Sequence, residues 1–263
     1  MITILQAEYR KIIATKTWWL LLLALVATTA VMAVLSAWMG FIQSQASGSP
    51  PQPDKLLRLT TVASASLCYV FPLALGAVMV TSEYRHHTIN LSMLGEPRRA
   101  RFVIGKLIIA VPFGALFGIA GTLAGTVTGA VTLRWKGLAV PLFDRAVIHT
   151  MLLSVLLVGI WVLLGVCLGL LVPNQSIAIA GIITFTQLIE PVIRLACQSW
   201  ETGRNMTRFL PGAAGEAALG DSFLNASNSG HLLEPWQGLV VLAGYGLVML
   251  VAGTMRLITT DIE

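Results

Sequence analysis

The sequence predicts an all-α polytopic membrane protein with six transmembrane helices, preceded by an amphipathic interfacial helix. Hydrophobic residues make up 56% of the 263 residues and charged residues only 11%, whereas soluble domains carry about 25% charged residues. Apolar runs of about 20 residues, the length that crosses a bilayer as a helix, recur six times along the chain. We therefore expect a single transmembrane domain over residues 1–263.

The first segment, residues 1–17, has the pattern of an amphipathic helix that lies in the membrane interface. Its apolar residues recur at helical spacing: Ile2, Leu5, Tyr9, Ile12 and Ile13. Glu8, Arg10 and Lys11 occupy other positions on the helical wheel. A simple extension of the first span is the alternative interpretation.

The six apolar runs define the expected spans: Trp18–Phe41, Thr60–Thr81, Ile104–Leu133, Val147–Val172, Ser176–Cys197 and Pro235–Leu257. Trp18, Trp19 and Trp38 lie near the ends of the first span, where tryptophan anchors a helix at the interface. The third run is longer than an upright span, so we expect it to tilt or to begin outside the membrane. An even number of spans places both termini on the same side.

Clusters of basic residues indicate the orientation, because cytosolic loops are enriched in Lys and Arg. The basic residues divide almost evenly between the two sides, but on one side they cluster: Arg10, Lys11 and Lys16 before the first span, then Arg85, Arg98, Arg99, Arg101 and Lys106 after the second. We therefore expect a multi-pass protein of the cell membrane with both termini in the cytoplasm. The charged loop at residues 82–103 is then cytosolic, and the loop at residues 198–234 is extracytoplasmic.

Glycines recur in the third and fourth spans at spacings that let helices approach closely. They are Gly114, Gly118, Gly121, Gly125 and Gly129, then Gly165 and Gly169. Packing within the chain is the simplest interpretation. A dimer seam or a wall of a substrate path are the others.

The fifth span carries two ionisable residues, Glu190 and Arg194, and such residues inside a span are candidates for function. They are four residues apart, so they share a helix face and can pair, and Pro191 should kink the helix between them. A structural ion pair and a gate on a substrate path both fit. In the loop that follows, Phe209–Leu219 predicts a short apolar helix opened by Pro211, either re-entrant or lying in the interface.

Catalytic and cofactor motifs are missing from the sequence. The histidines are scattered, and the three cysteines lie in apolar runs without metal or disulfide spacing. A phosphate loop needs a glycine five residues before Gly-Lys and a hydroxyl residue after it, but Gly105 and Lys106 are flanked by Ala100 and Leu107. We therefore expect no enzyme activity and no cofactor in this chain. Any energy for transport comes from an ion gradient or from another subunit.

The whole chain resembles the permease subunits of type-2 ABC exporters. Such permeases have six spans after an amphipathic helix with an acidic-aromatic-basic patch, which matches Glu8 to Lys11. Their first cytosolic loop carries a fairly specific pattern, which matches Glu83, Tyr84, Arg85, Thr88, Pro97, Arg98, Arg99 and Lys106. Their outer helix before the last span begins with Leu-Pro, here Leu210 and Pro211.

The resemblance implies the type-2 ABC exporter fold and a role as the subunit that forms the substrate path. It implies that the loop forms a coupling helix docked on a separate ATPase subunit, which binds ATP and Mg, and that the N-terminal helix touches the same subunit. The residues implicated in coupling are Glu83, Tyr84, Arg85, Thr88, Pro97, Arg98, Glu8 and Lys11. Those of the path or gate are Glu190, Arg194, Phe209 and Leu210.

The resemblance also implies a second permease copy, identical or homologous, as a partner beside the lipid bilayer. Nucleic acid is not an expected partner, because the basic residues sit in short loops between spans and are explained by topology and anionic headgroups. The alternatives are a secondary transporter, a membrane-embedded enzyme, and a six-span scaffold or sensor. The cargo is not specified by the sequence.

Overall fold

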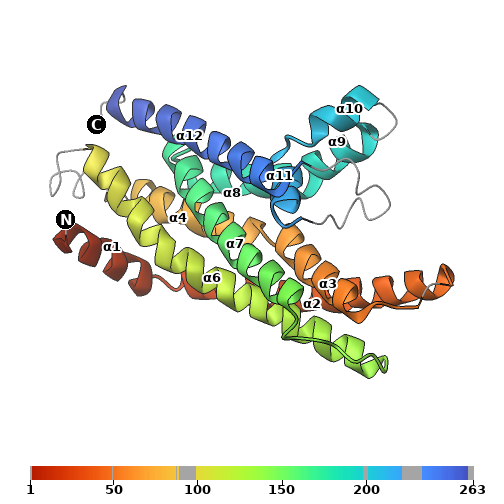
Figure 1. The fold of residues 1–263 in the computed structure, drawn as a ribbon. Helices are drawn as coiled ribbons and strands as arrows, with labels where there is room; N and C mark the ends of the chain where they lie inside the picture. Colours follow the sequence, from red (N-terminus) through yellow and green to blue (C-terminus); the bar gives the residue numbers. More distant parts are fainter. Residues whose placement is uncertain are drawn as a thin grey trace.

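The computed structural model describes residues 2–48, 50–86, 88, 99–197, 201–220 and 233–259, and these residues form helices without any strand. Six helical segments are long and apolar enough to cross a membrane: Thr17–Ala46, Pro53–Arg85, Ala100–Trp135, Arg145–Leu171, Gln175–Ala196 and Pro235–Leu257. The prediction of a polytopic helical membrane protein is confirmed at this level. Both termini lie at the same end of the bundle (Figure 1), here called the termini side. The other end is called the opposite side.

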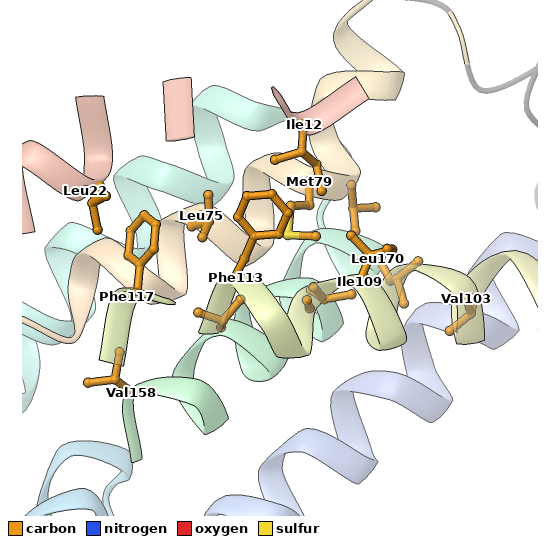
Figure 2. Packing of buried hydrophobic residues seen from close by; sticks show 14 of the residues in the cluster. Ile12, Leu22, Leu75, Met79, Val103, Ile109, Phe113, Phe117, Val158 and Leu170 are labelled. Atoms are coloured by element: carbon orange, nitrogen blue, oxygen red, sulfur yellow. The ribbon is translucent and has the colours of Figure 1, made fainter. Parts of the chain in front are cut away.

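Helix α1 (Ile2–Ala14) is separate from α2 (Thr17–Ala46), so the N-terminal segment is not an extension of the first span. Ile12 of α1 is buried, whereas Tyr9 is half exposed. Figure 2 shows Ile12 reaching from α1 toward Met79 and Phe113, which belong to the same apolar cluster. The predicted helix is therefore present, but the face that packs on the bundle includes the buried Glu8, and the apolar Ile13 is exposed.

The second span consists of two helices, α3 (Pro53–Leu67) and α4 (Val70–Arg85), and begins seven residues before the predicted Thr60. The break falls at Cys68 and Tyr69. Pro72 explains it, because proline has no N–H to bond the carbonyl four residues earlier and its ring crowds that carbonyl. Tyr69 therefore lies between the two helices, where its hydroxyl donates a hydrogen bond to Glu190 of the fifth span.

The third and fourth spans are α6 (Arg99–Trp135) and α7 (Arg145–Leu171). At about 1.5 Å per residue, the 37 residues of α6 extend well beyond a hydrocarbon core of about 30 Å, as predicted for this long run. Helix α7 packs against α4, α6 and α12 (Pro235–Thr259) and occupies the centre of the bundle (Figure 1).

Glycines permit this close packing, which supports the simplest interpretation of their spacing. A Cβ atom added to Gly165 of α7 would lie 2.1 Å from the carbonyl oxygen of Leu73 in α4. A Cβ added to Gly125 of α6 would lie 2.4 Å from the hydroxyl of Ser64 in α3. Both distances are shorter than any van der Waals contact, so these helices could not approach as they do with larger residues.

The fifth span is interrupted, as Pro191 predicts. It consists of α8 (Gln175–Thr184), a π-helical turn η1 (Phe185–Ile189) and α9 (Glu190–Ala196). Pro191 offers no N–H to the preceding turn, and a wider π-helical turn replaces the regular α-helix there. Asn174 opens the span, because its Oδ1 accepts hydrogen bonds from the backbone N–H groups of Ser176 and Ile177.

Two short helices follow, α10 (Glu201–Thr207) and α11 (Pro211–Ala218). Helix α11 begins at Pro211, as the sequence predicts. Residues 212–218 are buried, and α11 packs on α12, α7 and α3. The helix is therefore inserted among the spans at the opposite side.

Candidate functional site

A buried network of four charged side chains lies on the termini side, where α1, the end of α4 and the beginning of α6 meet. The Nζ of Lys106 donates to Oε2 of Glu8 (2.9 Å), to Oε1 of Glu83 (2.8 Å) and to the carbonyl of Met79 (2.9 Å). The Nζ of Lys11 donates to Oε1 of Glu8 (2.7 Å) and to Oε1 of Glu83 (2.9 Å). The network therefore pairs two carboxylates with two amino groups, and their formal charges cancel.

Burial distinguishes the members of this termini-side network. Lys106 is 1% exposed, Glu83 4% and Glu8 6%, whereas the side chain of Lys11 is 42% exposed. Burial alone favours the neutral acid of Glu8, but the charge of Lys106 and the hydrogen bonds from both lysines outweigh it and lower the pKa of Glu8. Burial likewise opposes the charge of Lys11, but its hydrogen bonds to Glu8 and Glu83 outweigh burial and raise its pKa. Both shifts favour the charged forms of Glu8 and Lys11.

Lys106 is one of the site residues that the sequence interpretation missed, because the sequence groups it with the basic residues of the loop. Its signal is that of a lone cation on an apolar helix, between Phe102 and Ile109, both of which are buried. A cation in such a place needs carboxylate partners. The structure supplies them from Glu83, 23 residues earlier, and Glu8, 98 residues earlier.

The other residues of the predicted coupling loop lie around this network. Tyr84 is half-buried and packs against the apolar cluster of Figure 2. Arg85 is exposed and donates to Oε1 of Gln175 at 3.3 Å, at the start of α8. The backbone N–H of Thr88 donates to the carbonyl of Glu83 at 3.0 Å, just beyond the end of α4. Pro97 and Arg98, also predicted for coupling, lie outside the described residues.

A second buried cluster lies on the opposite side and joins α9 to α11. Arg194 makes a two-pronged ion pair with Glu216, with both N–O distances at 2.8 Å. The expected pairing of Arg194 with Glu190 is therefore wrong. Helical spacing brings Glu190 to the same face, but a planar guanidinium binds best to both oxygens of one carboxylate, and the inserted helix α11 presents Glu216 in that geometry.

Glu190 instead joins α9 to the beginning of α11 and to the break in the second span. Its Oε1 accepts a hydrogen bond from the backbone N–H of Ala213 at 3.0 Å, and its Oε2 accepts one from the hydroxyl of Tyr69 at 3.3 Å. A Cβ atom on Gly212 would lie 2.6 Å from Oε1 of Glu190, so the carboxylate reaches α11 only beside a glycine. The ring of Tyr69 stacks on Trp161 of α7 with centroids 4.2 Å apart.

The two interrupted spans are joined at a further point near this cluster. The side-chain amide of Gln187, within the π-helical turn η1, donates to the carbonyl of Leu67, the last residue of α3, at 3.3 Å. The break at Cys68 and the π-helical turn therefore face each other. Breaks of this kind are frequent at functional sites in membrane helices.

Phe209 and Leu210, predicted as parts of a gate, begin the approach to α11. Phe209 is half exposed, and its carbonyl accepts a hydrogen bond from the hydroxyl of Tyr245 in α12 at 3.0 Å. Leu210 is extended and precedes the first turn of α11. The two groups of predicted gate residues are linked through α11, whose backbone N–H at Ala213 donates to Glu190.

Among the described residues, no group of three or more His, Cys, Asp or Glu side chains has the arrangement of a metal site. No model of a known protein family matches the chain, and no curated protein is significantly similar to it. The two buried clusters are accordingly interpreted from their own chemistry.

Proposed function

We propose that the chain is the membrane-spanning permease subunit of an ATP-driven exporter with the type-2 ABC fold. In this proposal it lies in the plasma membrane with both termini in the cytoplasm and pairs with a second permease copy. A separate ATPase subunit binds ATP and Mg and drives the transport step. The observation that carries the proposal is the termini-side network, because it ties α1 to both ends of the loop that resembles a coupling helix.

The network connects α1, α4 and α6, so that these three helices move together. Glu83 lies at the end of α4, just before the loop, and Lys106 lies near the start of α6, just after it. Separating them would expose charges in a site of low dielectric, which costs several kcal/mol. A push on the loop from an ATPase subunit therefore moves α1, α4 and α6 together.

Helix α4 carries such a displacement across the membrane. It packs along α7, and at its far end lies the break that holds Tyr69 against Glu190. A shift of α4 along its axis changes the Tyr69–Glu190 distance and thereby the contact of α9 with α11. In the proposed mechanism this is how energy entering at the loop reaches the opposite side.

A secondary transporter is the second candidate, and one observation favours it. The structure buries more ionisable groups than the single pair that the sequence indicates, since Lys106 and Glu216 join Glu190 and Arg194. Buried carboxylates of this kind serve as proton sites in gradient-driven carriers. Against this candidate, Lys106, Arg194 and Glu216 each have a partner of opposite charge. Glu190 accepts hydrogen bonds from the backbone N–H of Ala213 and the hydroxyl of Tyr69.

Co-purification tests the proposal. Tagged protein extracted from its native membranes in a mild detergent should bring down an ATP-hydrolysing subunit in fixed stoichiometry. Arg85→Ala should lower the coupled ATPase rate without changing that stoichiometry, and Arg134→Ala, an exposed arginine on the opposite side, should leave the rate unchanged. Transport by the chain alone, driven by an ion gradient, would contradict the proposal and favour the second candidate.

A further inference from the structure

Three helices converge on a small cavity inside the bundle, beside the break in the second span. Helices α2, α3 and α6 pack pairwise against one another. The cavity between them is lined by Thr29 of α2, Ser64 and Ala65 of α3, Cys68 at the break, and Thr122 of α6. Its volume, taken as the space open to the centre of a water molecule, is about 10 Å³. One water needs about 10–15 Å³ by this measure, so the cavity has room for a single water.

Glycines of α6 bring the other two helices close to Thr122. A Cβ atom on Gly125 would lie 2.4 Å from Oγ of Ser64, so this hydroxyl of α3 lies directly against α6. A Cβ atom on Gly121 would lie 3.2 Å from a methyl group of Leu25, which packs α2 against α6 about one turn earlier. Thr122 is three residues before Gly125 and therefore lies on the adjacent turn of the same face. The three helices thus meet around its side chain.

The hydroxyl of Thr122 has no hydrogen-bonding partner among the described residues, although this residue is only 5% exposed. Other buried hydroxyls donate to a carbonyl of their own helix, as those of Thr132 and Ser154 do at 2.8 Å. Threonine has a second helical rotamer, which turns its hydroxyl away from these carbonyls. An unpaired polar atom inside a protein is costly. The hydroxyl of Thr122 therefore indicates a partner from outside the chain.

The other two hydroxyls at the cavity can act as acceptors. That of Thr29 donates to the carbonyl of Leu25 at 2.8 Å, and that of Ser64 donates to the carbonyl of Thr61 at 2.9 Å. A hydroxyl has one hydrogen and two lone pairs, so both oxygens can still accept a hydrogen bond, whereas Thr122 can donate one. An occupant that donates two hydrogen bonds and accepts one completes this set, and water has those groups.

We propose that this cavity binds one water molecule, which joins α2, α3 and α6. The water donates to the hydroxyl oxygens of Thr29 and Ser64 and accepts from the hydroxyl of Thr122, and three hydrogen bonds are typical of a buried water. The described residues that line the cavity include no carboxylate to balance a cation. The water holds the end of α3 on α2 and α6 beside the break at Cys68. The site is independent of any ATPase partner.

Nuclear magnetic resonance detects this water in the unaltered chain. Protein with labelled threonine methyl groups is placed in nanodiscs of deuterated lipid. Magnetisation transfer from water should reach the methyl groups of Thr29 and Thr122, which belong to apolar spans where lipid excludes bulk water. Thr122→Val keeps the shape of the side chain and removes its hydroxyl, so the transfer to the methyl group of Thr29 should disappear. Absence of transfer to both methyl groups in the unaltered chain would overturn the proposal.

A double-mutant cycle measures the bridge through the stability of the protein. Thr122→Val should raise the equilibrium constant of unfolding in denaturing detergent about fivefold, the effect of losing one hydrogen bond. Thr29→Val should have a similar effect. The double variant should show less than the product of the two effects, because both changes release the same water. Thr132→Val is the control on α6, since its hydroxyl donates to its own helix, and its effect should be independent of Thr122→Val.

Three results of these stability measurements would overturn the proposal. A Thr122→Val protein as stable as the original, or more stable, would show that the hydroxyl is unpaired. Strictly independent effects of Thr29→Val and Thr122→Val would show that no shared molecule joins them. A loss of stability on replacing sodium by choline, seen in the original but not in Thr122→Val, would identify a cation at the site. Circular dichroism of each variant establishes that the helices are intact.

Discussion

Replacing Lys106 by methionine tests whether the termini-side network holds α1 on the bundle. The ammonium group is almost completely buried, and its hydrogen bonds to Glu8, Glu83 and the carbonyl of Met79 use all three of its donors. Methionine is of similar length and carries no charge, so it removes the attraction without opening a large cavity. The two carboxylates are then left with the ammonium of Lys11.

The cost follows from the burial of the remaining charges. Removing one partner of a buried ion pair costs about 3–5 kcal/mol, because the other charge is left uncompensated. We expect the lower end, about 3 kcal/mol, because Lys11 still contacts both carboxylates and is itself 42% exposed, so water reaches them. At about 1.4 kcal/mol per factor of ten, the detached population of α1 rises roughly a hundredfold.

Amide hydrogen exchange in nanodiscs measures this population. The protection of the α1 amides should fall by roughly that factor, while the amides of α7 keep theirs. Lys136→Met is the matched control on the opposite side. Lys136 lies 3.4 Å from the ring centroid of Trp38, a contact worth about 0.5–1 kcal/mol near the surface, and its loss should leave α1 unaffected. Unchanged protection of α1 in Lys106→Met would refute the reasoning.

Three further predictions follow from the same two clusters. The folded state lowers the pKa of Glu8, so the contribution of Glu8 to stability is present above its ordinary pKa and is lost as the pH falls through the lowered value. The protection of the α1 amides should therefore drop only in acid. Glu8→Gln should remove that drop. Gly212→Ala should lower the thermal unfolding temperature, because overpacking against Glu190 costs about 1–3 kcal/mol. Arg194→Gln should destabilise the protein by about 3–5 kcal/mol by leaving Glu216 unpaired, as measured by unfolding in denaturing detergent.

Two further variants serve as comparisons in the same chain. Gly244→Ala places the same methyl group in open space and should leave the unfolding temperature unchanged. Tyr69→Phe removes one hydrogen bond to Glu190 but keeps the stacked ring, and should cost only about 1 kcal/mol. An acid-side loss of α1 protection that persists in Glu8→Gln, or a Gly212→Ala protein as stable as the original, would contradict the assignments.

The spans themselves were predictable from the sequence, because apolar runs of membrane length admit few alternatives. The ends of the spans were less predictable than the spans themselves. Hydropathy predicts only the part of a helix that lies in lipid. Helix α3 begins two turns before the predicted span, and these turns contain Asp54, Lys55 and Arg58. The break before Tyr69 had a signal in Pro72, whose effect on the preceding turn is local and general.

The composition of the charged clusters was only partly predictable. Glu8, Lys11, Glu83, Glu190 and Arg194 were singled out from sequence, but their partners were not. Spacing along one helix relates only residues three or four apart, whereas the partner of a buried charge is chosen by how the helices pack. The partner Glu216 lies 22 residues from Arg194 on the inserted helix α11. The sequence predicts this helix as apolar, but no local pattern specifies that it packs beside Arg194.

The most direct test of the account is where an ATPase subunit touches the chain. A photoreactive amino acid in place of Thr88, at the end of α4, should crosslink to a co-purifying ATP-hydrolysing subunit, and the same amino acid in place of Phe209, on the opposite side, should not. The yield at Thr88 should change when ATP is added, because the proposed coupling moves this segment. Crosslinking to such a subunit from Phe209 and not from Thr88, or from neither position, would contradict the account.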